Sequence, residues 1–318
     1  EQRLILLSDG YRILQADIAD IQLGGHDPQP AAQATEPNPE QCPDSMQFPF
    51  EVRGGQMVVQ AQLNGVAGNF LVDTGAQATI ANTVHFKPDE LPTFALDHAM
   101  PSGVGGNMAN VLGTRDLDLV WGDLKVDVAR ALAVDLSHLE ESLGLPIVGL
   151  IGIDVLERFE LRFDYTKGVL DLYRLGSNGQ PVATLAASEP VEIIPFDMVG
   201  HIPVFTVQIA GQSLRLGLDS GASDAMLFEK WEDDLADEFE FIRTAEMRGA
   251  DKSVRTGSEV RFDRMRVKNI DYRNMIFRFN DIVALAGNSQ QMDGLLGFQF
   301  LSARPTSVNF RSRQIKIW

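Results

Sequence analysis

The chain has 318 residues, of which 44% are hydrophobic, so it is long enough for two domains of ordinary size. Its formal net charge of −17 argues against nucleic acid and anionic membranes as partners, although an acidic surface does not by itself specify a substrate. The single cysteine, Cys42, excludes an intrachain disulfide and a cysteine-rich metal site. The sequence contains no apolar run of roughly 18 residues, so it predicts no membrane span.

The N-terminal region differs in composition from the rest of the chain. Two short apolar runs, Leu4 to Leu7 and Tyr11 to Leu14, flank Ser8-Asp9-Gly10, which predicts a β-hairpin. Residues 26–49 are rich in Pro, Ala, Gln and Asn and show no apolar periodicity, so we expect a linker there. Residues 1–47 are therefore interpreted as an N-terminal extension.

The remaining chain divides into two parts, residues 48–174 and 191–318, joined by a Gly-containing connection at 175–190. In the first part, alternating apolar residues predict strands, and two apolar segments predict short helices. The predicted strands cover residues 57–63 and 68–72, and the predicted helices cover residues 136–143 and 153–159.

The second part adds an acidic segment at residues 229–239. Trp231, Leu235 and Phe239 recur there at helical spacing, with acidic residues between them. This pattern predicts an amphipathic surface helix that packs its apolar stripe on the core.

The two parts are copies of one unit. Four anchor segments recur at an interval of 146 residues (195 − 49 and 219 − 73) or 145 residues (297 − 152), which indicates a tandem duplication. The pairs are Phe48-Pro49-Phe50 with Ile194-Pro195-Phe196, Asp73-Thr74-Gly75 with Asp219-Ser220-Gly221, Val148 to Gly152 with Asp293 to Gly297, and Val169 to Tyr173 with Gln314 to Trp318.

The motif Asp-Thr/Ser-Gly at the end of an apolar strand, followed later by an apolar-apolar-Gly segment, resembles the retropepsins and the pepsin-like aspartic peptidases. The resemblance covers residues 48–318 in both halves. It implies a mostly β fold of two homologous β-barrel lobes with a few short helices, related by a pseudo-twofold axis. Retropepsins are homodimers, whereas this chain carries both lobes, so we expect a monomer.

The resemblance implies an aspartic endopeptidase that acts on a peptide or protein substrate without a cofactor or metal. Asp73 and Asp219 are the expected catalytic dyad, because two adjacent carboxyls can share one proton and serve as acid and base. Gly75 and Gly221 allow the tight turns. In this family the hydroxyls at the positions of Thr74 and Ser220 brace the two loops against each other.

Two departures from the family pattern are present. Ala76 and Ala222 stand where pepsin-like enzymes carry a hydroxyl that would lower the pKa of the dyad, so we expect an optimum at roughly pH 4.5 to 6.5. The Asp–Arg ion pair of retropepsins is absent, because its positions hold Gln77 with Ile153 and Ser223 with Phe298.

The segment Met100 to Gly106 resembles the glycine-rich flap tip of retropepsins. Its residues Gly103, Val104, Gly105 and Gly106 suit a mobile hairpin that closes over substrate. A phosphate-binding loop is the alternative, but no Lys-Ser/Thr follows. The corresponding segment of the second half, residues 247–252, has fewer glycines.

Other readings remain open at the level of sequence. The five histidines form no closely spaced ligand pair, so we expect no zinc site. A non-catalytic peptide-binding module could retain the same fold. Residues 1–47 could be either a simple extension or a prosegment. The low cysteine content and the start at Glu1 lead us to expect a periplasmic or secreted bacterial protein, although a cytoplasmic one also fits.

Overall fold

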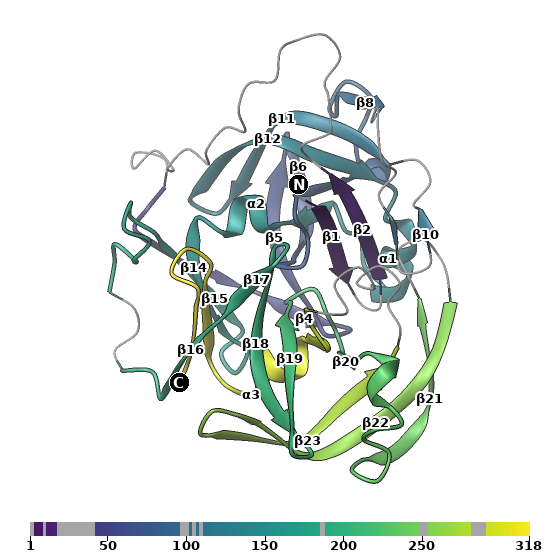
Figure 1. The fold of residues 1–318 in the computed structure, drawn as a ribbon. Helices are drawn as coiled ribbons and strands as arrows, with labels where there is room; N and C mark the ends of the chain where they lie inside the picture. Colours follow the sequence, from purple (N-terminus) through teal and green to yellow (C-terminus); the bar gives the residue numbers. More distant parts are fainter. Residues whose placement is uncertain are drawn as a thin grey trace.

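The computed structural model describes residues 3–8, 11–17, 42–95, 102–103, 106–107, 111–184, 188–248, 254–280 and 291–318. In these ranges the protein is mostly β, with short helices, and forms two lobes joined by a shared sheet. Figure 1 shows lobe 1 at the top of the view and lobe 2 at the bottom. The predicted fold class is confirmed.

Lobe 1 is built on an eight-stranded sheet with the order β4-β5-β6-β13-β7-β12-β11-β8. An additional pairing of β5 with β11 curls this sheet towards a barrel. The predicted strands at 57–63 and 68–72 correspond to β5 and β6. The strands are β4 (Glu51–Arg53), β5 (Gln56–Leu63), β6 (Val66–Val72), β7 (Ile80–Asn82), β8 (Thr93–Ala95), β11 (Leu112–Trp121), β12 (Leu124–Val134) and β13 (Gly149–Ile151).

Lobe 2 repeats this topology strand for strand. Its sheet has the order β17-β18-β19-β24-β20-β23-β22-β21, and the additional pairing is again between the second strand and the seventh, β18 with β22. The duplication read from the sequence is therefore present in the structure. The strands are β17 (Asp197–Val199), β18 (Ile202–Ile209), β19 (Gln212–Leu218), β20 (Ala225–Leu227), β21 (Glu240–Arg248), β22 (Val254–Val267), β23 (Ile270–Phe279) and β24 (Gly294–Leu296).

A six-stranded antiparallel sheet takes three strands from each half and joins the lobes. Its order, β16-β26-β25-β14-β15-β3, is symmetric about the central pair β14 and β25. Beside that pair, the buried carboxylate of Glu160 accepts two 2.9 Å bonds from Lys316 Nζ and a 2.6 Å bond from Ser307 Oγ. The strands are β3 (Ser45–Pro49), β14 (Phe159–Asp164), β15 (Val169–Arg174), β16 (Glu192–Pro195), β25 (Thr306–Asn309) and β26 (Gln314–Ile317).

The N-terminal hairpin is confirmed. Strands β1 (Arg3–Ser8) and β2 (Tyr11–Asp17) pair antiparallel, and β2 pairs in turn with β9 (Ser102–Gly103), which pairs with β10 (Gly106–Asn107). The predicted linker is wrong at its end, because residues 45–49 form β3, where Met46 and Phe48 point inward. The rest of that linker up to residue 41 lies outside the described residues.

The helices in the described part of the chain are α1 (Ser137–Leu143), α2 (Ile153–Leu156) and α3 (Phe298–Ala303), with 3₁₀ turns η2 (Thr83–His85) and η3 (Glu229–Trp231). The prediction at 136–143 is confirmed. The helix predicted over 153–159 ends at Leu156, because Phe159 already pairs in the central sheet.

The amphipathic helix predicted over residues 229–239 is wrong. Only η3 forms there, and turns follow it. The run of acidic residues places like charges at helical spacing, which disfavours a helix. The apolar stripe still packs inward, since Leu235 is buried and the ring of Phe239 lies 5.7 Å from that of Phe262.

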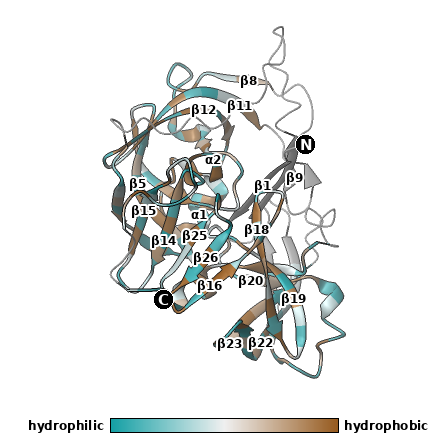
Figure 2. Cartoon of the chain, turned by 60° about the vertical axis from the view of Figure 1, so that its left-hand side comes forward, coloured by the Kyte–Doolittle hydropathy of each residue, from teal (hydrophilic) through white to brown (hydrophobic). Residues whose placement is uncertain are grey.

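The core follows the alternation of the strands. Figure 2 shows hydrophobic and hydrophilic residues alternating in colour along strands of both lobes. One continuous cluster of buried apolar side chains runs through both lobes and the central sheet, and a smaller one lies beside α1 in lobe 1. None of the helices that the structure describes has the length and apolar character of a membrane span.

Candidate active site

The two predicted aspartates lie at equivalent points of the two lobes. Asp73 follows β6 directly, and Asp219 follows β19. In each lobe a short parallel strand supports this point: the Asp73 amide donates to Ile151 O at 3.0 Å, and the Asp219 amide donates to Leu296 O at 3.0 Å. The apolar-apolar-Gly segments thus lie beside the aspartate loops, as predicted.

The glycines that end these segments are required by close packing. A Cβ on Gly152 would lie 2.5 Å from the carbonyl carbon of Ala78, and a Cβ on Gly297 would lie 1.9 Å from Ala222 O. No side chain fits at such distances, so each loop rests directly on the backbone that follows the short strand. The amide of Ile153, the residue after Gly152, also donates to Ala76 O at 2.8 Å and so links the first aspartate loop to this backbone.

The two loops brace each other across the lobe boundary. The amide of Thr74 donates to Ser220 Oγ at 3.0 Å, and the amide of Ser220 donates to Thr74 Oγ1 at 2.9 Å. Ser220 Oγ also donates to Val72 O at 2.9 Å. These groups are buried, so the reciprocal bonds hold the loops in one relative position.

The two carboxyls are fully buried and adjacent. A Cβ on Gly75 would lie 2.4 Å from Asp219 Oδ2, so only glycine lets the first loop approach the second aspartate. In each loop the glycine amide donates to its own aspartate at 2.8 Å, from Gly75 to Asp73 Oδ1 and from Gly221 to Asp219 Oδ1.

Burial raises the pKa of Asp73 well above its ordinary value of 3.8, and the neighbouring Asp219 raises it further, while hydrogen bonds from the amides of Gly75 and Ala76 lower it. Because two such carboxyls cannot both ionise easily, the pair retains a proton and can present an acid and a base together.

Two further side chains reach the loops from the opposite lobe, and the sequence analysis did not single them out. Gln56 Nε2 donates to Gly221 O at 2.8 Å, and His201 Nε2 donates to Gly75 O at 2.7 Å. Both side chains are buried. The signal that could have found them is a polar residue just after the glycine turn in each copy, 17 residues before Asp73 (73 − 56) and 18 before Asp219 (219 − 201).

Tyr165 is another residue that the sequence did not indicate. It lies in the turn between β14 and β15, with its ring 5.0 Å from that of Phe50 and 5.5 Å from that of Phe298. Burial raises the pKa of its phenol, and the nearby charge of Asp219 raises it further. A lobe 1 side chain therefore contributes to the surroundings of the lobe 2 aspartate.

The predicted flap is described only in part. Ser102–Gly103 and Gly106–Asn107 form the paired strands β9 and β10, as expected for a hairpin, whereas Val104 and Gly105 lie outside the described residues. Its role over the cleft stays a prediction. The corresponding lobe 2 segment, residues 247–252, lies partly outside the described residues.

The residues next to the positions of the missing retropepsin ion pair make different contacts in the two lobes. In lobe 1 the partly buried carboxyl of Asp154 accepts a 3.0 Å bond from Thr79 Oγ1. In lobe 2 the side chain of Asp224 forms a 2.9 Å ion pair with Arg278, which also contacts Glu259. The lobes share a backbone plan but surround their aspartates with different charges.

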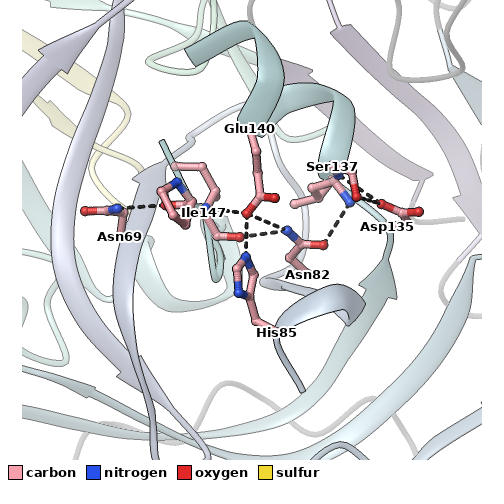
Figure 3. A network of polar contacts seen from close by, with 9 residues as sticks. Asn69, Asn82, His85, Asp135, Ser137, Glu140 and Ile147 are labelled. Atoms are coloured by element: carbon pink, nitrogen blue, oxygen red, sulfur yellow. Dashed lines mark hydrogen bonds and ion pairs between the residues drawn. The ribbon is translucent and has the colours of Figure 1, made fainter. Parts of the chain in front are cut away.

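A separate polar network joins α1 to the loop before β13 and is shown in Figure 3. Glu140 Oε1 accepts from the amide of Ile147 at 2.7 Å and from Asn82 Nδ2 at 3.3 Å, and it also contacts His85 Nε2. Asn82 Oδ1 accepts from the amide of Leu136 at 2.9 Å. Since its members bind backbone groups of lobe 1, we interpret this network as structural.

Among the described residues, no group of three or more His, Cys, Asp or Glu side chains could hold a metal ion. What the site does contain is a pair of buried carboxyls on braced loops, one from each of two duplicated β-lobes. This arrangement defines the class of two-lobed acid-protease folds.

The chain belongs to the aspartyl protease family. The family model for aspartyl proteases matches it twice, over residues 59–155 and residues 205–300, and each match contains one of the two aspartates. The tandem duplication of an aspartyl protease unit is thereby confirmed. No curated protein matches the chain at a significant level.

Proposed function

We propose that the protein is an aspartic endopeptidase that hydrolyses peptide bonds with a water activated between Asp73 and Asp219. The observation that carries the proposal is the pairing of these two buried carboxyls on loops braced by Thr74 and Ser220. A family member that had lost the chemistry would have no need to preserve both carboxyls, both glycines and both hydroxyls in this geometry.

The mechanism follows from the shared proton. The ionised carboxyl takes a proton from the water, and the protonated carboxyl donates to the oxygen of the scissile carbonyl as the tetrahedral diol forms. A proton then passes to the leaving nitrogen. The raised pKa of Asp73 supports this cycle, because it favours a pair that retains one proton.

The surroundings of the dyad support a mildly acidic optimum. Ala76 and Ala222 are buried and bring methyl groups where a hydroxyl would otherwise stabilise the ionised carboxyls. We therefore place the optimum at roughly pH 4.5 to 6.5. A sharp optimum below about pH 3 would contradict this reasoning.

Further details belong to the same proposal. The lobes are of the retropepsin type, the segment Gly103 to Gly106 acts as the flap, and the substrate has apolar side chains next to the cut. The protein acts as a monomer, because one chain supplies both aspartates, and it works in the periplasm or outside the cell.

The test is cleavage of a mixed peptide library between pH 3 and 8 by the wild type, Asp73→Asn and Asp219→Asn. We expect a loss of at least about 10³-fold in kcat for either variant, because each removes one member of the acid–base pair. Asp123→Asn, at an exposed turn between β11 and β12, is the matched control and should cut normally. A wild type that binds peptides without cutting them would instead identify a peptide-binding module.

A further inference from the structure

Each lobe sends one buried side chain into the aspartate loop of the other lobe. Gln56 is the first residue of β5, and His201 directly precedes β18, so the two lie one residue apart when the copies are aligned on their aspartates (201 − 56 = 145, against 219 − 73 = 146). The carbonyls that accept their bonds are equivalent: Gln56 binds Gly221 O at 2.8 Å, and His201 binds Gly75 O at 2.7 Å. A hydrogen bond to this glycine carbonyl is present in both halves, with an amide donor in one and an imidazole donor in the other. This recurrence indicates that the carbonyl needs a donor.

The accepting carbonyls belong to the Gly–Ala peptides that follow the two aspartates. The Gly75 carbonyl and the Ala76 amide are the two ends of one peptide, and hydrogen bonds from the amides of Gly75 and Ala76 stabilise the charged form of Asp73. In lobe 2 the Gly221 carbonyl and the Ala222 amide likewise form one peptide, and the Ala222 amide donates to the backbone oxygen of Asp219 at 3.3 Å.

A bond to a peptide carbonyl fixes the orientation of that peptide and polarises its N–H, so the amide beyond it becomes a better donor. His201 thereby acts at one end of the peptide whose other end faces Asp73. The Thr74 and Ser220 hydroxyls hold the loops relative to each other, whereas Gln56 and His201 hold the Gly–Ala peptides that follow the aspartates.

We propose that Gln56 and His201 are positioning residues for the dyad, each orienting from the opposite lobe the Gly–Ala peptide that follows the partner aspartate. The proposal rests on the proposed peptidase function. It requires a hydrogen-bond donor at each place and not an imidazole as such, since an amide does the same work in the other lobe.

The experiment compares His201→Leu, which removes the donor, with His201→Gln, which restores an amide donor as in the other lobe. Gln56→Leu removes the second donor, and Gln208→Leu, an exposed glutamine on β18, is the matched control for that substitution. Circular dichroism establishes that each variant is folded, and kcat and KM are measured on one peptide substrate.

We expect His201→Leu and Gln56→Leu to lower kcat by about 10- to 100-fold with KM changed less than about threefold, because a misplaced catalytic group costs rate more than binding. His201→Gln should recover most of the loss, and Gln208→Leu should behave as wild type. Equal loss in His201→Gln and His201→Leu, an effect confined to KM, or wild-type kcat in His201→Leu would overturn the proposal.

A second measurement is independent of turnover. In ¹H–¹⁵N spectra the amide signal of Ala76 should move in His201→Leu and return towards its wild-type position in His201→Gln, because the bond to the preceding carbonyl is lost and restored. An unmoved Ala76 signal would refute the proposal. A wild type that cuts no peptide yet shows this pattern would defeat the proposed function alone, since the positioning contact would still stand.

Discussion

Replacing Asp154 with Asn should stabilise the protein above pH 6 and leave its stability near pH 4 almost unchanged. Asp154 lies in α2, two residues after the glycine that supports the first aspartate loop, and its side chain is partly buried. Burial raises the pKa of its carboxyl from 3.8 to about 6, against hydrogen bonds from Thr79 and the charge of Arg158, which lower it.

The direction in which stability changes with pH follows from proton binding. Between pH 3.8 and about 6 the folded protein keeps a proton on Asp154 that the unfolded chain has released, so stability falls as pH rises through this window. Each pH unit is equivalent to about 1.36 kcal/mol, and the gap of about two units therefore amounts to about 3 kcal/mol at pH 7. Asn carries no charge to bury, and its carbonyl can still accept the Thr79 hydroxyl.

The assay is urea unfolding of the wild type and Asp154→Asn at several pH values from 4 to 8, with the difference in unfolding free energy plotted against pH. Taking the difference cancels the titration of other groups. Asp123→Asn serves as the control for a carboxyl replaced at an exposed turn and should show no such slope.

The expected curve for Asp154→Asn rises by about 3 kcal/mol between pH 4 and 7 and is flat beyond that. A difference that does not depend on pH would show that the Asp154 carboxyl does not titrate as the structure implies. A difference that falls with rising pH would mean that the charged form is stabilised in the folded state, and the reasoning would be refuted.

Two further predictions concern the brace and the N-terminal hairpin. Ser220→Ala leaves the Thr74 amide and the Val72 carbonyl without their buried partner, so the free energy of unfolding in urea should fall by about 1–3 kcal/mol. Ser220→Thr should largely restore it, and wild-type stability in Ser220→Ala would contradict the role of the brace. Cutting the chain at a protease site inserted after residue 30 should raise kcat/KM about tenfold, equivalent to ~1.4 kcal/mol, because β2 pairs with β9, which is part of the predicted flap. A scrambled site is the control, and unchanged activity would show that the hairpin does not restrain the flap.

The pairing of residues 45–49 in the central sheet bears on how the N-terminal region should be removed. A deletion of residues 1–47 would take away three of the five residues of β3, which pairs with β15 from Ser45 to Pro49. Loss of activity in such a deletion would therefore report damage to the sheet and not the role of the hairpin. A cut before residue 42 avoids this.

Much of the fold could be read from the chain because the signals are local. Alternation of apolar residues identified β5 and β6, and the recurrence of one motif at a constant interval identified two equal lobes. The aspartate motif could be recognised for the same reason, since its glycine and hydroxyl neighbours are adjacent in sequence. The helix prediction at residues 229–239 was wrong because it weighed only the helical spacing of three apolar residues. The like charges between them disfavour the helix.

The sequence by itself determined the duplication, the β class and the two aspartates, because each rests on short motifs whose residues are adjacent in the chain and which can be recognised again in the second copy. Only the tertiary structure decided that residues 45–49 complete the central sheet, that the surroundings of Asp154 raise its pKa, and that Gln56 and His201 reach across to the opposite loops. These contacts join segments 75 to 165 residues apart, such as Thr79 with Asp154 and Gln56 with Gly221. No local pattern encodes them, since a side chain's partner across such a separation is set by how the sheets pack and not by its neighbours in sequence.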